Sequence, residues 1–529
     1  MADVPVLRLP DEPSLEQLRK QAKDLRRAVL AADPEAVAEA AARFPDAPPG
    51  FPLRAAQLVV ARRYGFASWT RLKRHVEIVT RYSRFPDRVS THSTADTFLR
   101  LACLTYGDAD EPAWRDEAWR IIDVDPGLIT GNVHVAAATA DAGELRRILG
   151  ADPAAAQREG GPFGWEPLLY LVYARHDPAI SADATLGAAR LLLDAGADPN
   201  AGYLWHGLPS PFTVLTGVFG EGELGPERQP RHPHSLALAR LLLQAGADPN
   251  DNQALYNRQF TPGNDHLELL FEFGLGTGDG GPWRRRLGHA LPSPTEMVRD
   301  QLSGAITHGL TQRVRLLVEH GADVTAPLAN GATATAMAAT TGHADLVDYL
   351  AAHGAPPLDL ALPDAFVSAA LAADRTRVGQ LLADHPGLAD LVRASRPALV
   401  TWAAACADPA AVELVVELGF DVNAKGRTDI PSDQPWQTAL HKAAEDGNVE
   451  LAGTLLRLGA DPGIRDARFD GTPLDWARHF GQQAVVDLLE PITGLPLTRV
   501  REARHRDQGR PRAVPDVLAG PPEAGLSHG

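Results

Sequence analysis

Thr438-Ala439-Leu440-His441-Lys442-Ala443 and Thr472-Pro473-Leu474-Asp475-Trp476-Ala477 repeat one short pattern. The Thr, Leu and Ala of the second copy each follow those of the first by 34 residues. A fixed period of about 33 residues is typical of a chain built from stacked units of two helices. One such unit cannot bury its own apolar face, so the whole stack is the folding unit.

The residue types in these two copies fit a turn followed by two antiparallel helices. The Thr side chain can accept a hydrogen bond from an amide of the first helical turn, and Pro473 fits the first helical position. Gly447 and Gly459 stand where helices should end, because glycine readily adopts the left-handed conformation found there. Leu451 and Leu455 fall on one face of the second helix, which is therefore amphipathic.

The two copies resemble the T-P-L-H-x-A core of the ankyrin-repeat family. Looser copies extend this resemblance over roughly residues 95–490, as about ten or eleven units. The resemblance implies an all-α fold, namely an ankyrin-repeat solenoid of helix-turn-helix units with short hairpin loops. It also implies that His441 is a structural residue whose hydrogen bonds hold adjacent hairpins. Only five of the 51 basic residues are Lys, which together with the abundant Ala suggests a bacterial coding sequence.

The spacing of the pattern divides the chain into four segments. Residues 1–90 predict an N-terminal helical capping segment, and residues 64–77 look like the segment found ahead of ankyrin arrays in many bacterial proteins. Residues 91–275 predict repeats with long insertions between their helices, and residues 276–493 predict regular repeats. Residues 494–529 are rich in Arg, Pro and Gly without an apolar period, so we expect them to be disordered.

Composition indicates a cytoplasmic protein. The two cysteines, Cys103 and Cys406, lie far apart on apolar stretches, which favours reduced thiols over a disulfide framework or zinc ligands. The first residues contain no secretory apolar core, and no apolar run is long enough to span a bilayer. We therefore expect no membrane partner.

Charge is unevenly distributed along the chain. Residues 1–90 hold 16 Lys and Arg against 11 Asp and Glu, whereas the remaining residues hold 35 against 56. Phosphate contacts need concentrated Lys and Arg, so the acidic body argues against a nucleic-acid partner. A nucleic-acid binder working through residues 62–74 is a third, weaker hypothesis, since such a basic run is usually a solvated helix face.

Residues that could carry chemistry are scarce. The chain has no Walker loop, no G-x-S-x-G, no H-E-x-x-H and no Cys pairs at zinc spacing, so we expect no enzyme, no catalytic residue and no cofactor. The insertions do hold Glu221, Glu223, His232 and His234, with His176 and His266 in the neighbouring turns. Stacking could bring these side chains together on a metal ion, or as an acid and a base. The competing interpretation is that they order the loop by hydrogen bonds.

Two classes of function follow from this pattern. The first is a protein–protein interaction scaffold, because stacked repeats form an extended concave surface that ankyrin proteins generally use to bind other proteins. The alternative is a metal- or small-molecule-binding protein, conceivably an enzyme, that uses the insertions between residues 176 and 266. An acidic surface favours a basic protein partner.

Carried over by position, the residues expected to contact the partner lie on hairpin tips and inner helices. They are Gln434, Trp436, Gln437, Glu445, Asp446, Arg468, Phe469, His479 and Phe480, with Thr340 and Thr341 in the unit that starts at Gly331.

Overall fold

The computed structural model describes residues 6–10, 12–107, 110–427 and 434–493. These residues form mostly helices, which confirms the all-α class, and the predicted disordered tail 494–529 lies outside them. The chain divides into two compact units, residues 1–338 with 345–358 and residues 339–344 with 359–529. The boundaries at 90 and 275 inferred from sequence both fall inside the first unit and stay predictions.

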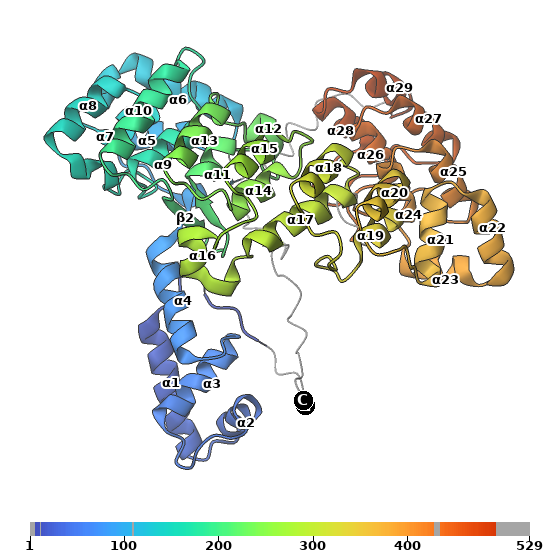
Figure 1. The fold of residues 1–529 in the computed structure, drawn as a ribbon, viewed down its shortest axis with the longest axis horizontal. Helices are drawn as coiled ribbons and strands as arrows, with labels where there is room; N and C mark the ends of the chain where they lie inside the picture. Colours follow the sequence, from blue (N-terminus) through green and yellow to red (C-terminus); the bar gives the residue numbers. More distant parts are fainter. Residues whose placement is uncertain (1–5, 11, 108–109, 428–433, 494–529) are drawn as a thin grey trace. The chain divides into compact units, whose positions relative to one another are not determined.

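The first unit begins with four helices that share a core (Figure 1). They are α1 (Leu15–Leu30), α2 (Pro34–Arg43), α3 (Leu53–Arg63) and α4 (Trp69–Tyr82). Leu18, Ala22 and Leu25 form the apolar face of α1 and are buried. Ser14 and Ser68 begin α1 and α4 by accepting hydrogen bonds from first-turn amides, as N-cap residues do.

A small sheet follows these helices and departs from the purely helical expectation. It consists of β1 (Ser83–Arg84), β2 (Gly202–Trp205) and β3 (Pro211–Thr213). β1 pairs in parallel with β2, with Ser83 opposite Leu204, and β2 pairs antiparallel with β3. The segment directly after α4 therefore bonds to a hairpin more than a hundred residues later.

Helix pairs fill the rest of the first unit. Their bounds are α5 (Thr94–Ala102), α6 (Pro112–Val124), α7 (Val133–Ala138), α8 (Ala142–Ala151), α9 (Pro167–Tyr173), α10 (Ala182–Asp194), α11 (Val214–Phe219), α12 (Gly225–Arg228), α13 (Ser235–Gln244), α14 (Asn252–Arg258), α15 (Asp265–Glu272), α16 (Gly281–Leu287), α17 (Pro294–Thr307), α18 (Thr311–Glu319), α19 (Ala334–Thr340) and α20 (Ala344–Ala352). Short 3-10 turns are η1 (Pro86–Arg88), η2 (Pro126–Ile129), η3 (Pro153–Gln157) and η4 (Gly288–Ala290).

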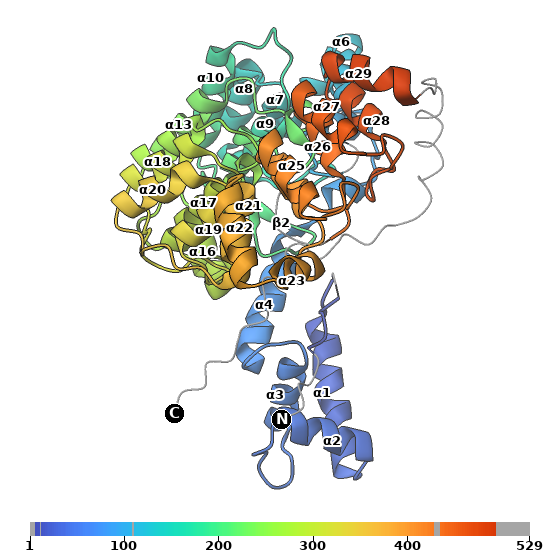
Figure 2. The ribbon, with the colours of Figure 1, turned by 90° about the vertical axis from the view of Figure 1, so that its right-hand side faces the viewer.

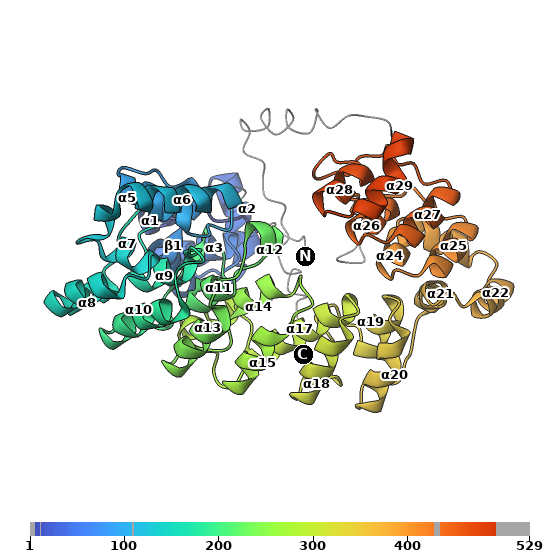
Figure 3. The ribbon, with the colours of Figure 1, turned by 90° about the horizontal axis from the view of Figure 1, so that it is seen from above.

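These pairs form two layers in the first unit. The inner helices α7, α9, α11, α14 and α17 pack each on the next, and so do the outer helices α8, α10, α13 and α15 (Figure 3). Inner helices are nearly all buried; every residue of α9, from Pro167 to Tyr173, is inside. Outer helices bury only a stripe, such as Leu238, Ala239 and Leu242 in α13. This asymmetry is what a stack of amphipathic pairs requires.

The second unit has the same two-layer arrangement (Figure 2). Its helices are α21 (Leu362–Leu371), α22 (Arg375–Asp384), α23 (Leu388–Ser395), α24 (Leu399–Ala405), α25 (Pro409–Glu417), α26 (Ala439–Glu445), α27 (Val449–Arg457), α28 (Pro473–His479) and α29 (Gln483–Thr493). Inner helices α24, α26 and α28 pack in series, as do outer helices α25, α27 and α29.

Local chemistry at α26 and α28 agrees with the sequence pattern. Thr472 caps α28 in a reciprocal capping box with Asp475, and Pro473 is the first helical residue. In α26 the box is between Thr438 and His441, whose Nδ1 lies 2.8 Å from Thr438 Oγ1. The other ring nitrogen of His441 lies 3.0 Å from the Gly471 carbonyl of the next hairpin. The expected structural role of His441 is confirmed.

Replacing His441 by Ala should therefore destabilise the second unit. The change removes a fully buried side chain and leaves the Gly471 carbonyl without its donor, so we expect a loss of about 2 kcal/mol in the free energy of unfolding. Urea unfolding measures the loss. His479→Ala is the control, because His479 is exposed and should change stability by less than about 0.5 kcal/mol. Equal stability of both variants would contradict the assignment.

Candidate interaction surface

Asp466 organises the hairpin between α27 and α28. Its carboxylate accepts hydrogen bonds from the backbone amides of Arg468 (2.8 Å), Phe469 (2.5 Å) and Gly471 (2.8 Å), and from Trp476 Nε1 (3.0 Å). Burial alone would raise the pKa of Asp466, but these donors outweigh it and the pKa is lowered. One carboxylate thus fixes both the turn and the ring on the following helix.

The residues at and around this turn form what we call the tip surface: Trp436, Arg468, Phe469, His479 and Phe480. Phe469 is 61% exposed and Phe480 is 46% exposed. Both rings contact the buried Trp476, with centroid distances of 6.2 Å and 6.0 Å. Both exposed rings pack against an indole whose position is fixed, so their own motion is restricted. This restriction lowers the entropy cost of binding a partner.

Trp436 lies at the other side of the tip surface between two guanidinium groups. Arg427 lies 4.7 Å and Arg468 lies 4.8 Å from the centre of the Trp436 ring. Both distances suit cation–π attraction, so the hairpins that carry the two arginines are joined through one indole. The half-buried Trp436 presents a rim of ring to solvent and belongs to the same surface.

Most residues expected to contact a partner are accessible, with two corrections. Gln434, Asp446 and Arg468 are exposed, whereas Glu445 and Thr340 are half-buried. Lys442 Nζ forms ion pairs with both Glu445 (3.2 Å) and Asp446 (2.9 Å), so a single cation offsets part of the charge of these two carboxylates.

The two corrections are Gln437 and Thr341, which the sequence analysis wrongly placed on the surface. Gln437 is 4% exposed, because its backbone pairs with that of Gly426 through hydrogen bonds of 3.1 Å and 2.9 Å. Thr341 is 2% exposed, and its carbonyl accepts a hydrogen bond from Trp402 Nε1 (3.3 Å). Arg427 and Asp466 were not among the residues expected from the sequence to form this surface.

The carboxylates proposed as metal ligands are engaged by other groups. Glu221 is 4% exposed and forms ion pairs with Arg258, which is fully buried, and with Arg231 at 3.2 Å. Thr261 also donates a hydrogen bond to Glu221 (2.7 Å). Glu223 accepts a hydrogen bond from the Tyr256 hydroxyl (2.7 Å). Glu221 and Glu223 therefore hold the insertion on α14, which fits the interpretation that they order the loop rather than the alternative that they bind a metal ion.

The histidines of the insertion are only partly brought together. The rings of His176 and His232 meet edge to face with centroids 4.5 Å apart, whereas His234 turns its Nε2 to the Ile180 carbonyl at 2.9 Å. His266 is buried in α15 beside Phe219. Among the described residues, no three His, Cys, Asp or Glu side chains are arranged to hold a metal ion. The alternative that His232 and His234 form a metal site is therefore not supported by the arrangement of these described residues.

Burial keeps the paired histidines neutral. It lowers the pKa of His176 to about 3 and brings the pKa of His232 well below its usual range, with the nearby Arg175 adding to both effects. His232 Nδ1 accepts a hydrogen bond from the His234 amide (3.1 Å), so the ring proton sits on Nε2. Neither Nε2 has a hydrogen-bond partner among the described residues.

Arg175 binds the insertion without any carboxylate. Its guanidinium is buried and donates to the carbonyls of Val172, Tyr173 and Ala174 at the end of α9. It also reaches the Gly217 carbonyl (2.8 Å) and the Pro230 carbonyl (2.7 Å). The end of a helix leaves carbonyls unpaired and carries partial negative charge, so a cation is favoured there. Burial nevertheless lowers the pKa of Arg175 to about 10.

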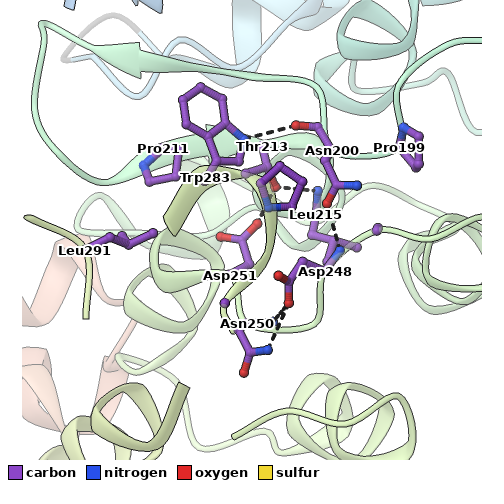
Figure 4. A pocket seen from close by; sticks show the side chains of 13 residues that line it. Pro199, Asn200, Pro211, Thr213, Leu215, Asp248, Asn250, Asp251, Trp283 and Leu291 are labelled. Atoms are coloured by element: carbon purple, nitrogen blue, oxygen red, sulfur yellow. Dashed lines mark hydrogen bonds between the residues drawn. The ribbon is translucent and has the colours of Figure 1, made fainter. Parts of the chain in front are cut away.

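A small cavity lies where β3, α14 and α16 meet (Figure 4). Asp248, Asn250, Asp251, Thr213 and Trp283 contribute to its lining. Its volume of about 20 Å³ has room for roughly one water molecule. Asp251 is held by Thr213 and Thr216 and begins α14 as its N-cap, so its role is structural. The cavity is too small for the small-molecule ligand of the alternative hypothesis.

The basic residues between 62 and 74 are mostly bound within the chain. Arg62 donates to the Arg43 carbonyl (2.6 Å), and Arg63 forms two hydrogen bonds of 2.8 Å with Glu39. Arg74 donates to the Arg285 carbonyl (2.6 Å), and Lys73 pairs with Glu77 at 3.4 Å. This run serves internal contacts, so it offers few free cations for phosphate.

Comparison with known proteins locates one family match. Residues 436–467 match the profile of the family described as "Ankyrin repeat". This stretch is similar to an ankyrin repeat. It contains α26 and α27 together with Trp436 and Asp466, whereas Phe469 and Phe480 lie beyond its end, before and after α28.

A similarity to a curated protein covers a short stretch. The chain is 38% identical over 90 residues to "Putative glutaminase 3" of Caenorhabditis elegans, which is 17% of this chain and 14% of that protein. The chain therefore matches only a small part of that relative. Within the described residues, no helix combines the length and apolar character needed to cross a membrane.

Replacing Asp466 by Ala should loosen the tip surface. Three backbone amides and the Trp476 indole lose their common acceptor, so we expect a loss of about 2 kcal/mol in the free energy of unfolding and a shift in tryptophan emission. Urea unfolding followed by fluorescence measures both. Glu450→Ala on α27 is the matched control, because this carboxylate is exposed. An unchanged emission spectrum in Asp466→Ala would contradict the role assigned to Asp466.

The buried histidines predict a loss of stability in acid. An unfolded His has a pKa near 6.5, so below this pH the unfolded chain binds more protons than the folded one, and stability falls as pH falls. Each such His contributes up to about 1.4 kcal/mol per pH unit. His232→Gln removes one proton site while keeping an acceptor for the His234 amide, and should flatten this dependence. Urea unfolding between about pH 6 and pH 5 tests it.

The control for this experiment is His92→Gln, which replaces an exposed imidazole. It should keep the acid dependence of the wild-type protein. If His232→Gln and the wild type lose stability equally between the two pH values, then the buried pair does not govern acid stability.

Proposed function

We propose that this protein is an interaction scaffold that binds a protein partner through the tip surface of its second unit. The observation that carries the proposal is the pair of exposed rings, Phe469 and Phe480, beyond the end of the stretch at 436–467 that is similar to an ankyrin repeat. Ankyrin repeats generally serve protein binding through hairpin tips and inner helices. On this view the chain works by binding, without a catalytic step or a cofactor, in the cytoplasm.

The chemistry of the tip surface suits a partner with an apolar anchor. Aromatic residues and Arg are enriched at the energetic centres of protein interfaces. Phe469, Phe480 and the Trp436–Arg468 stack supply these types within two adjacent hairpins. The Asp466 hydrogen bonds hold the turn before any partner arrives, so less ordering entropy is lost on binding.

Most charged side chains around the tip surface form ion pairs within the chain. Electrostatic attraction at this surface therefore contributes little to the choice of partner. Lys442 pairs with Glu445 and Asp446, and Arg478 pairs with Glu490. Beyond this surface the chain is acidic, with a formal net charge of −16. A basic partner would be drawn by this long-range field, which speeds encounter, and would then be anchored by apolar contact.

The test is a quantitative pulldown from the native host with the Phe469→Ala/Phe480→Ala variant. Removing two anchoring rings at a cost of about 2 kcal/mol each should reduce recovery of the specific partner by roughly 100-fold or more. Leu391→Ala/Val449→Ala is the matched control, since it removes exposed apolar side chains elsewhere in the same unit. The proposal fails if the partner lists of the two variants and the wild type are the same.

A further inference from the structure

The outward face of α1 is a continuous basic strip, which we call the α1 strip: Arg19, Lys20, Lys23, Arg26 and Arg27. All five side chains are exposed. At about 100° per residue they occupy a sector of about 120° on the side away from the buried Leu18, Ala22 and Leu25. The hydrophobic core of the N-terminal helices therefore fixes where these cations point.

Among the residues that the structure describes, most of these cations have no partner. Arg27 pairs with Asp24 at 3.3 Å, with both side chains well exposed. For Arg19, Lys20, Lys23 and Arg26, the described residues provide no ion pair or side-chain hydrogen bond. Glu16 is the remaining acid on this helix and lies at its N-terminal end. The strip thus keeps a surplus of positive charge, in contrast to residues 62–74.

We infer that the α1 strip binds the phosphate backbone of a nucleic acid. Five cations between residues 19 and 27 span about 12 Å of helix axis, or roughly one charge per 3 Å. Each strand of a duplex carries one phosphate per about 3.4 Å of axis. The two linear charge densities match, and a rigid helix presents its charges without reordering. Neutralised phosphates release condensed counterions, which is the main source of such binding energy.

A membrane surface and an acidic protein fit the α1 strip less well. A helix that lies in a membrane interface inserts its apolar face, but that face of α1 is buried against α3. Between Arg19 and Arg27 the outward sector holds no apolar side chain. Exposed ion pairs with a protein contribute little each, whereas a polyanion gains from every counterion that is released.

We expect this strip to contact mainly phosphates, which carry no sequence information. Gln17 and Gln21, the amide side chains of α1 that could read base edges, lie outside the basic sector, and Gln21 is occupied by Tyr64 and Arg63. In physiological salt, charges that lie more than about 10 Å from the α1 strip are largely screened. The acidic residues in the rest of the chain therefore do not cancel the local attraction between the strip and a phosphate. The general argument from net charge against nucleic acid therefore does not apply to α1.

The experiment measures binding of the full chain to labelled duplex DNA of about 20 base pairs by fluorescence anisotropy over a range of salt concentrations. The wild type should give a log–log salt slope of about −4, one increment of −0.9 for each phosphate contacted. Arg19→Gln/Lys23→Gln/Arg26→Gln should bind about tenfold or more weaker at low salt and reduce the slope by about 2.7. Gln has a helix propensity close to those of Lys and Arg, so the fold is kept.

The matched control is Arg146→Gln/Arg190→Gln/Arg377→Gln, which removes three exposed arginines and the same net charge from other helices. It should bind like the wild type. Equal weakening in both triple variants, or a wild-type slope near zero, would overturn the inference. So would equal or tighter binding to poly-glutamate, or to vesicles of phosphatidylcholine with phosphatidylserine, at the same salt concentration. The Phe469→Ala/Phe480→Ala variant should bind DNA normally, which separates this activity from the proposed scaffold function.

Discussion

In both units, each helix pair must bury its apolar face against a neighbouring pair, and this requirement determines how the helices pack. Inner helices such as α7, α9 and α11 are buried along their whole length, so none of them would be stable as part of an isolated pair. Small residues make this close packing possible, and Ala136, Ala137 and Ala138 are all fully buried in α7. Because the core grows only along the stack, the outer hairpin tips are free to vary without cost to the interior. The tip surface and the insertions are both consequences of that freedom.

The sequence predicted correctly those features whose interacting residues lie close together in the chain or in adjacent repeats. The Thr472 capping box, Pro473 and the role of His441 depend on neighbours a few residues away or in the adjacent repeat. Prediction from the sequence failed where the partner comes from a distant segment that no period predicts. Glu221 resembles a free ligand in the sequence because Arg258, which neutralises it, follows 37 residues later. Likewise, Gln437 occupies an expected surface position, but its backbone pairs with Gly426 and its side chain is buried.

The insertions show how backbone polar groups can be buried inside a stack of helices. Arg175 and Arg313 are buried, and both donate mainly to backbone carbonyls, including those at the end of α9 and in the turn after α14. A guanidinium has five donors in a fixed plane, so one side chain satisfies several carbonyls that would otherwise be buried without partners. Loss of either donor would leave these carbonyls unpaired, which makes such sites costly to change. This explains why long insertions coexist with a continuous core.

The pairing of β1 with β2 has a consequence for the N-terminal helices. β1 covers the outer edge of β2, and the His206 amide continues the contact to the Arg84 carbonyl at 3.0 Å. A chain trimmed to begin at α5 would present that edge with unsatisfied amides and carbonyls, open to strand addition from another molecule. The two residues of β1 thus protect the edge of β2 from pairing with another molecule.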